Sequence, residues 1–189
     1  MSKRFEMRFA GSGGQGVILA SVIFAEAAVI SGMKTIQSQA YGPEARGGVS
    51  KAETVLSRDQ IWYSKVTEPH FLLALTQASI NKYSEDLKED YIVMADESLT
   101  VPGNLDPARV ISVPILQTAT EKIGKAFTAN IVAVGAINKA LRLFDDEVML
   151  EAVKRHIPPG TERINKEALT AGAELIPDEA ADRFARTVE

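Results

Sequence analysis

Cysteine is absent from this 189-residue sequence, and histidine occurs only twice, as His70 and His156. Without cysteine there can be no disulfide, no thiolate nucleophile and no cysteine-bound zinc ion or iron–sulfur cluster. The presence of only two histidines also argues against a histidine-based metal site. Any redox chemistry in which this chain takes part must therefore depend on a bound cofactor or on a partner subunit.

The sequence also lacks an excess of positive charge and a long apolar run. Its 21 Lys and Arg residues are outnumbered by 25 Asp and Glu residues, which argues against a nucleic-acid partner. No uninterrupted apolar segment approaches the ~20 residues needed to span a bilayer. Residues 1–4 are basic in part, but they lead into an alternating segment and not into a signal-peptide core. We therefore expect no membrane association and a cytoplasmic location.

The length and apolar content are sufficient for one domain with a full core. The sequence contains no internal repeat, linker or low-complexity segment. We expect a single domain over residues 1–176, followed by a mobile or partner-bound C-terminal tail over residues 177–189.

Glycine is concentrated in one short stretch, Gly11-Ser12-Gly13-Gly14-Gln15-Gly16. An expected strand, residues 5–10, precedes it, and an apolar helix over residues 15–31 follows it, with Gly32 as the helix stop. In this context the G-x-G-x-x-G spacing has two interpretations. The glycines either allow helix and strand to pack closely, or they let an anion reach the helix N-terminus. Four glycines in six residues exceed what a tight turn needs, which favours the anion site.

A second loop, residues 39–48, combines three glycines with Pro43 and the opposed charges of Glu44 and Arg46. It is either a solvated turn, or a loop in which Arg46 lies beside the first glycine stretch and binds a carboxylate or phosphate. We favour the second interpretation. The expected strand before it, residues 34–38, is followed by no Asp or Glu. A dinucleotide-binding domain should carry one there, so this feature disfavours a free-standing NAD(P) or flavin oxidoreductase.

The remaining pattern alternates strands with helices and then becomes helical. Residues 49–56 and 61–66 predict an antiparallel hairpin, with Trp62 as a packing residue or a subunit-interface anchor. Buried strands are expected at 71–75 and 91–95, a short strand at 110–113, and helices at 76–87, 115–124, 130–144, 147–156 and 163–173. Asn130 is the expected N-cap of its helix, Gly135 a point of close helix packing, and His156 a partner of a helix dipole. The pattern predicts an α/β fold, an open, mostly parallel Rossmann-like sheet with an antiparallel edge hairpin and a helical C-terminal part.

In such sheets, ligands bind beyond the carboxyl ends of the strands. That edge would bring the two glycine-rich loops together with Thr76-Gln77 and Asp96-Glu97. No residue is a convincing acid, base or nucleophile, so we expect binding roles only and no metal ligand. The candidate binding residues are Gly11, Ser12, Gly13, Gly14, Gln15, Gly16, Tyr41, Glu44, Arg46, Gly47, Gly48 and Gln77.

Three motifs in this order resemble the gamma subunit of 2-oxoacid:ferredoxin oxidoreductases, over about residues 4–175. They are the glycine stretch at 11–16, Tyr-Gly-Pro-Glu-Ala-Arg-Gly-Gly at 41–48, and Asn-Ile-Val-Ala-Val-Gly-Ala at 130–136. The form of the second motif is most similar to that of the 2-oxoglutarate enzymes, 2-oxoglutarate synthases. Pyruvate, branched-chain 2-oxoacid and indolepyruvate enzymes are the alternatives within the family.

The resemblance implies a role within a multi-subunit enzyme. Such an enzyme decarboxylates a 2-oxoacid on thiamine diphosphate, reduces ferredoxin through iron–sulfur clusters and releases an acyl-CoA. Thiamine diphosphate, magnesium and the clusters would lie on alpha, beta and delta partner subunits. The gamma domain of the family packs against the thiamine-binding subunits and is associated with coenzyme A, so the glycine stretch and Arg46 would hold CoA phosphates. A non-catalytic, homo-oligomeric nucleotide-binding module is the rival hypothesis. We expect the isolated chain to form a homodimer, because removal of its partners would expose apolar surface.

Overall fold

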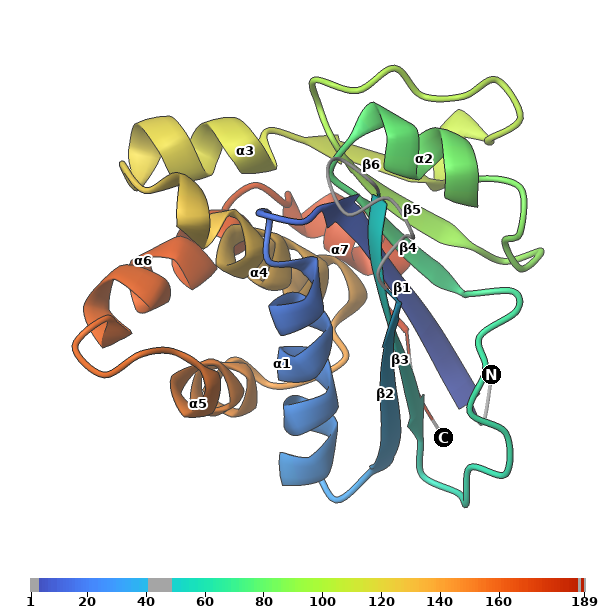
Figure 1. Ribbon diagram of the computed structural model, residues 1–189, viewed down its shortest axis with the longest axis horizontal. Coiled ribbons are helices and arrows are strands. Elements are labelled where there is room, and N and C mark those ends of the chain that lie inside the picture. Colours follow the sequence, from blue (N-terminus) through green and yellow to red (C-terminus); the bar gives the residue numbers. More distant parts are fainter. Residues whose placement is uncertain (1–3, 41–48, 187, 189) are drawn as a thin grey trace.

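A computed structural model describes residues 4–40, 49–186 and 188. Strands and helices alternate through its first part, and helices dominate its last third (Figure 1). The strands are β1 (Arg4–Ser12), β2 (Lys34–Ala40), β3 (Val49–Ser57), β4 (Phe71–Ala74), β5 (Ile92–Asp96) and β6 (Val110–Val113). The helices are α1 (Val17–Ile30), α2 (Gln77–Tyr83), α3 (Ile115–Gln117), α4 (Ala129–Leu141), α5 (Asp146–His156), α6 (Glu162–Ala173) and α7 (Asp178–Phe184). Short turns of 3-10 helix (η1, Pro107–Arg109; η3, Ala126–Thr128) and of π-helix (η2, Thr118–Lys122) flank them.

The strands form one six-stranded sheet in the order β2-β3-β1-β4-β5-β6. Strands β1, β4, β5 and β6 are parallel, as buried strands joined by helical crossovers should be. Strand β3 is antiparallel to both of its neighbours, β1 and β2. The predicted fold class is therefore confirmed, since a mostly parallel sheet carries an antiparallel pair at one edge.

The members of the antiparallel hairpin differ from the prediction. Strand β3 pairs with β2, from Lys34 opposite Ser57 to Ala40 opposite Lys51, whereas residues 61–66 form no strand. The aromatic and β-branched residues of 61–66 fit a strand pattern, but β1 and β2 already occupy both edges of β3. No edge is left for a further strand there. The pairing of 49–56 with 61–66 was wrong for this reason.

The two faces of the sheet carry separate apolar clusters. Alternation along β1 puts Phe5, Met7 and Phe9 on one face, in the large cluster that also takes in α1, α4 and α5. Ala10 lies on the opposite face with Leu72 and Ala74, in a smaller cluster covered by α2. Figure 1 shows this arrangement, with α1 and α4 on one side of the sheet and α2 on the other.

Helix α1 runs across the first face and ends as predicted. Gly32, two residues beyond its last residue, has a φ of +72°, the left-handed conformation in which glycine closes a helix. Helix α5 packs beside it. His156 Nε2 lies 3.2 Å from Glu26 Oε2, and Arg155 Nη1 lies 2.8 Å from Glu26 Oε1. The Arg155 hydrogen bond holds the pKa of Glu26 below its usual range. His156 thus pairs with a carboxylate of a neighbouring helix.

The segment after Pro177 was expected to be a mobile or partner-bound tail. In the structure it forms helix α7, which packs on α4. Ala181, Phe184 and Val188 are buried in the main cluster, and Arg58 Nε donates to the Val188 carbonyl at 3.0 Å. The expectation of a tail was wrong for the described residues, because apolar residues at helical spacing find a face to bury. Every helix of residues 4–40, 49–186 and 188 is too short or too polar to span a bilayer.

Candidate anion-binding site at the glycine turn

The glycine stretch runs from the end of β1 into the first turn of α1. Its conformation is held by Gln15, whose backbone N–H donates to the Ser12 carbonyl at 3.2 Å. The Gln15 side chain accepts from the Ser12 N–H at 2.7 Å and donates through Nε2 to the Leu75 carbonyl at 3.1 Å. Since Leu75 directly follows β4, Gln15 fastens the turn to the carboxyl end of the neighbouring strand.

At two of the four glycines a side chain would disturb the packing around the turn. A Cβ atom on Gly11 would lie 2.7 Å from Gln15 Oε1. Gly16 has a φ of +68°, and a Cβ atom there would lie 2.6 Å from Asn130 Nδ2. Contacts under 3.0 Å do not occur for real Cβ atoms, so side chains at both positions would force a shift. For Gly11 and Gly16 the packing interpretation holds.

The two central glycines, Gly13 and Gly14, have no such reason. Both are exposed. A Cβ atom on Gly13 would meet only Ser50 Oγ at 3.8 Å, and one on Gly14 would meet nothing within 4 Å. Neither has a positive φ. The fold would accept side chains here, and their absence leaves the backbone open to close approach from outside.

This open backbone lies directly before the N-terminus of α1. Gly16 occupies the N-cap position and no side chain caps the helix. The first backbone hydrogen bond of the helix runs from Ala20 N to the Gly16 carbonyl at 3.1 Å. The three preceding amides, of residues 17–19, have no acceptor among the described residues and can donate to an external partner. Together with the positive end of the helix dipole, they form an anion-binding arrangement.

Asn130 was expected to be the N-cap of the helix that contains it. It is instead the second residue of α4, which begins at Ala129 after Thr128 at the N-cap position. The 3-10 turn η3 sets this start and moves Asn130 inside the helix. There its side chain is buried and lies against Gly16. Sequence reasoning singled out this residue but missed its place beside the glycine turn, because two distant helix starts meet there.

The second glycine-rich loop cannot be compared with the prediction in the same way. Its candidate residues lie outside the described residues; they are Tyr41, Glu44, Arg46, Gly47 and Gly48. The described residues on either side are placed, however. Val49 pairs with Ser12 of the glycine stretch, and Ala40 pairs with Lys51. Both flanks therefore belong to the edge of the sheet where the first loop lies.

Two other polar residues predicted at this edge, Gln77 and Asp96, form hydrogen bonds with other parts of the chain. The Gln77 side chain donates to the Thr100 carbonyl at 2.9 Å and accepts from the Thr100 N–H at 2.8 Å, which ties α2 to the loop after β5. Asp96 is buried and accepts from the Ser98 hydroxyl at 2.5 Å and from the Leu116 N–H at 2.8 Å. The sheet edge gathers these residues as expected, but their polar groups hold loops and helix α3 in place.

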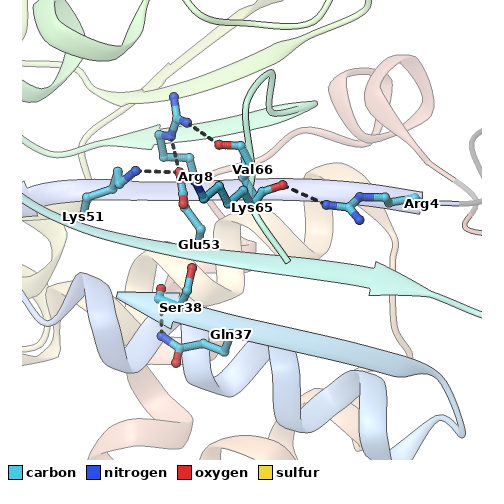
Figure 2. A network of polar contacts seen from close by, with 8 residues as sticks. All are labelled: Arg4, Arg8, Gln37, Ser38, Lys51, Glu53, Lys65 and Val66. Carbon is cyan, nitrogen blue, oxygen red and sulfur yellow. Dashed lines mark hydrogen bonds and ion pairs between the residues drawn. The ribbon is translucent and has the colours of Figure 1, made fainter. Parts of the chain in front are cut away.

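A buried ion network on the α2 face was not predicted (Figure 2). Arg8 of β1 and Glu53 of β3 lie opposite each other, and Arg8 Nε donates to Glu53 Oε1 at 2.8 Å. Lys51 Nζ lies 2.9 Å from the same oxygen. Arg8 Nη2 donates to the Val66 carbonyl at 3.2 Å, and its guanidinium lies over the Tyr83 ring, 5.1 Å from the centroid. Burial raises the pKa of Tyr83.

The sequence offered one signal for this network, the alternation of Lys51 and Glu53 on one face of their strand. Such alternation of charged residues is typical of a strand face exposed to water, yet Glu53 is 7% exposed and Arg8 4% exposed. The network also holds residues 63–66 on the sheet, because Arg4 donates to the carbonyls of Tyr63 and Lys65. Figure 2 shows Arg4 and Arg8 reaching this segment from the same strand.

Comparison with known proteins shows the family to which the sequence is similar. A family model described as pyruvate ferredoxin/flavodoxin oxidoreductase matches residues 6–175. The 2-oxoglutarate synthase subunit KorC of Methanothermobacter marburgensis is 41% identical over 180 residues, which cover 92% of this chain and 97% of that protein. The ketoisovalerate oxidoreductase subunit VorA of Methanothermobacter thermautotrophicus is 37% identical over 173 residues, 89% of this chain but only 35% of VorA.

Two solved structures share the fold. The gamma subunit of a keto/oxoacid ferredoxin oxidoreductase from Geobacter sulfurreducens superposes with a TM-score of 0.78 at 40% identity, covering 90% of this chain and 96% of that one. The 2-oxoglutarate:ferredoxin oxidoreductase of Magnetococcus marinus, solved with 2-oxoglutarate, coenzyme A and succinyl-CoA bound, superposes with a TM-score of 0.79 at 20% identity. This chain covers 32% of that chain, and 95% of its own length is matched.

Proposed function

This chain belongs to the pyruvate ferredoxin/flavodoxin oxidoreductase family, and from that premise we propose that it is the gamma-type subunit of a 2-oxoglutarate:ferredoxin oxidoreductase. The observation that carries the proposal is the similarity to KorC proteins over nearly the full length of both chains. VorA and the common gamma subunits of pyruvate/ketoisovalerate oxidoreductases are less similar, so 2-oxoglutarate is favoured over pyruvate and branched-chain 2-oxoacids.

The proposed complex converts 2-oxoglutarate and coenzyme A into succinyl-CoA and CO₂, and the electrons released reduce ferredoxin. Thiamine diphosphate, magnesium and the iron–sulfur clusters would lie on alpha, beta and delta partner subunits. Thiamine diphosphate, once bound there, supplies the carbanion chemistry of decarboxylation. We expect this chain to contribute no acid, base or nucleophile to that step. Its part is to bind and orient.

We assign the glycine turn as the seat of an anionic group of coenzyme A. Gly13 and Gly14 lack side chains without any need from the fold, and the free amides at the start of α1 point out of an uncapped helix end. Ser12 and Gln15 shape the turn through their hydrogen bonds, and Gly11 and Gly16 let it pack. Tyr41, Glu44, Arg46, Gly47 and Gly48 stay proposed members of the site, since the strand residues flanking them lie at the same edge. Gln77 supports the edge through Thr100.

The complex itself gives the test of this function. The chain carrying an affinity tag is purified from its native host under anaerobic conditions, and the eluate is assayed with coenzyme A, an electron acceptor and each of several 2-oxoacids. We expect co-elution of thiamine-enzyme and cluster-bearing subunits and the formation of succinyl-CoA from 2-oxoglutarate. Recovery of the chain without partners, or activity with pyruvate or indolepyruvate in place of 2-oxoglutarate, contradicts the proposal. The cytoplasmic location stays a prediction.

Trp62 marks a candidate contact for a partner subunit. Its side chain is 89% exposed and that of Tyr63 is 55% exposed, so the interpretation of Trp62 as a packing residue was wrong. Arg4 and Arg8 hold the backbone of this segment on the sheet, and an exposed aromatic residue on an anchored segment is typical of interface hot spots. We expect Trp62→Ser to lower the recovery of partner subunits, whereas Val29→Ser, at another exposed apolar residue on α1, leaves it unchanged. Homodimerisation of the isolated chain stays a prediction, and a monomer in sedimentation contradicts it.

A further inference from the structure

The start of a second helix meets the glycine turn. Asn130, the second residue of α4, is 4% exposed, and its side chain lies against Gly16, the N-cap of α1. Helices α1 and α4 pack on each other on the same face of the sheet (Figure 1). In neither helix does a side chain at the N-cap position accept from the first turn. Two uncapped N-termini, of helices of 14 and 13 residues, therefore converge at one point.

The orientation of the Asn130 amide follows from its hydrogen bond. Its Oδ1 accepts from the Ile131 N–H at 3.0 Å, which satisfies one of the unpaired amides of the first turn of α4. The Nδ2 group is left as the donor on the side of Gly16. Among the residues that the structure describes, Nδ2 has no hydrogen-bond partner. It lies 2.6 Å from the position that a Cβ atom on Gly16 would occupy.

Nδ2 is not among the fully buried side-chain atoms that lack a partner, so this unused donor of a nearly buried side chain reaches the surface, where a ligand can accept from it. The glycine at position 16 also makes room for this side chain. Because Gly16 has no Cβ atom, the Asn130 amide can lie against the start of α1.

We propose that Asn130 is a ligand-binding residue, whose Nδ2 donates to an oxygen of the phosphoryl group held at the glycine turn. This inference rests on the proposed anion-binding role of the turn. It extends that role by naming a side-chain donor from a second helix. A phosphate or pyrophosphate presents several acceptor oxygens and can accept from both helices at once, whereas a single carboxylate has fewer to share.

The side-chain amide of Asn130 itself gives the direct test. In the full-length chain labelled with ¹⁵N, the Asn130 N–H₂ resonances are assigned through their proximity to the Gly16 amide, and inorganic pyrophosphate is added. We expect these resonances to shift with the same saturation curve as the amides of residues 17–19. The N–H₂ group of Asn165, which donates to Thr161 at 2.9 and 3.0 Å, serves as the control and should not move.

Two variants test how much the Asn130 donor contributes to pyrophosphate affinity. Asn130→Ser removes the donor, and Asn130→Asp replaces it with a negative charge at nearly constant volume. We expect pyrophosphate affinity to fall about tenfold to a hundredfold in the first, as for a lost hydrogen bond to a charged group, and further in the second. Circular dichroism confirms the fold of each variant. If a variant does not fold, the resonance shifts of the unaltered chain decide.

The outcomes separate this inference from the function on which it rests. Unmoved Asn130 resonances at saturating pyrophosphate, or wild-type affinity in folded Asn130→Ser, overturn the role of Asn130. If Gly13→Val abolishes binding in that case, the glycine turn still binds the anion. If the unaltered chain binds no pyrophosphate and the amides of residues 17–19 do not respond, both proposals fail.

Discussion

Gly135 of α4 and Gly172 of α6 each lie against the backbone of the other helix. A Cβ atom on Gly135 would be 2.0 Å from the Leu169 carbonyl oxygen, and one on Gly172 would be 1.9 Å from the Val132 carbonyl oxygen. The reciprocal contact lets the two helices approach closely and fixes the position of α4. Because α4 also carries Asn130, the packing of α4 on α6 helps to fix the position of Asn130 beside the glycine turn.

The first prediction concerns this contact. Glycine-to-alanine substitution inside a helix normally stabilises it by roughly 0.5–1 kcal/mol. At Gly135 or Gly172 the new methyl group would meet a carbonyl oxygen of the other helix, which cannot rotate away. We expect Gly135→Ala and Gly172→Ala each to lower the free energy of unfolding by about 2 kcal/mol or more. Urea denaturation followed by circular dichroism measures the change.

Gly103 is the matched control, because a Cβ atom there would meet nothing within 4 Å. Gly103→Ala should change the free energy of unfolding by less than about 0.5 kcal/mol. If Gly135→Ala is as stable as the unaltered chain, the helices are not in backbone contact.

The second prediction compares the two ends of the buried ion pair. After Arg8→Met, Glu53 keeps Lys51 at 2.9 Å, and the Arg8 Nη1 atom, which is buried without a hydrogen-bond partner, is removed. After Glu53→Gln, the buried Arg8 guanidinium keeps no carboxylate partner among the described residues. We expect Glu53→Gln to cost about 3 kcal/mol of unfolding free energy and Arg8→Met clearly less.

An exposed ion pair provides the reference for this comparison. Arg163 Nη1 and Glu167 Oε1 lie 2.6 Å apart on α6, with side chains 83% and 49% exposed. Glu167→Gln should cost no more than about 0.5 kcal/mol. Equal losses from Glu53→Gln and Arg8→Met would contradict the view that Lys51 supports Glu53.

The third prediction concerns acid stability. His70 is buried, its Nδ1 accepts from the Glu6 N–H at 3.1 Å, and its ring stacks on Phe5. Burial lowers the pKa of His70 from 6.5 to about 4. Between these values the unfolded chain binds a proton that the folded chain does not, so stability falls as the pH falls through this window. The loss reaches about 3 kcal/mol at the acidic end.

The free energy of unfolding measured from pH 7 to pH 4 checks this prediction. In His70→Phe, which cannot titrate and can keep the ring stack, the decline should be much shallower. Glu26, whose pKa is lowered by Arg155, loses its contribution only below its unfolded value of 4.5, so Glu26 does not contribute to a decline between pH 6.5 and pH 5. An identical decline in both proteins would show that His70 is not buried in its neutral form.

Strand and helix positions were largely predictable, because strong periodicity and glycine stops mark them. Strand β6 and helix α1 agree with the prediction to within two residues at each end. The strand partner of residues 49–57 was not predictable, because an alternating pattern says which face is buried but not which neighbour pairs. The nearest segment in the sequence, residues 61–66, was the wrong choice.

The site was predictable in part. The glycine motif located the turn and the helix end, since both depend on local sequence. The contact between Asn130 and Gly16 joins residues more than a hundred positions apart, and helix propensity alone favoured an N-cap role. The buried position of Arg8 was likewise hidden, because it depends on Glu53 and Tyr83 converging from other elements.

The affinity of the assembled complex for coenzyme A tests the central claim most directly. Gly13→Val places a branched side chain over the open turn, and the nearest atom to its Cβ would be Ser50 Oγ at 3.8 Å, so the fold should be retained. We predict that the KM for coenzyme A rises at least about tenfold, while the KM for 2-oxoglutarate stays unchanged and Gly103→Val behaves as the unaltered complex. An unchanged KM for coenzyme A in the Gly13→Val complex would contradict the account.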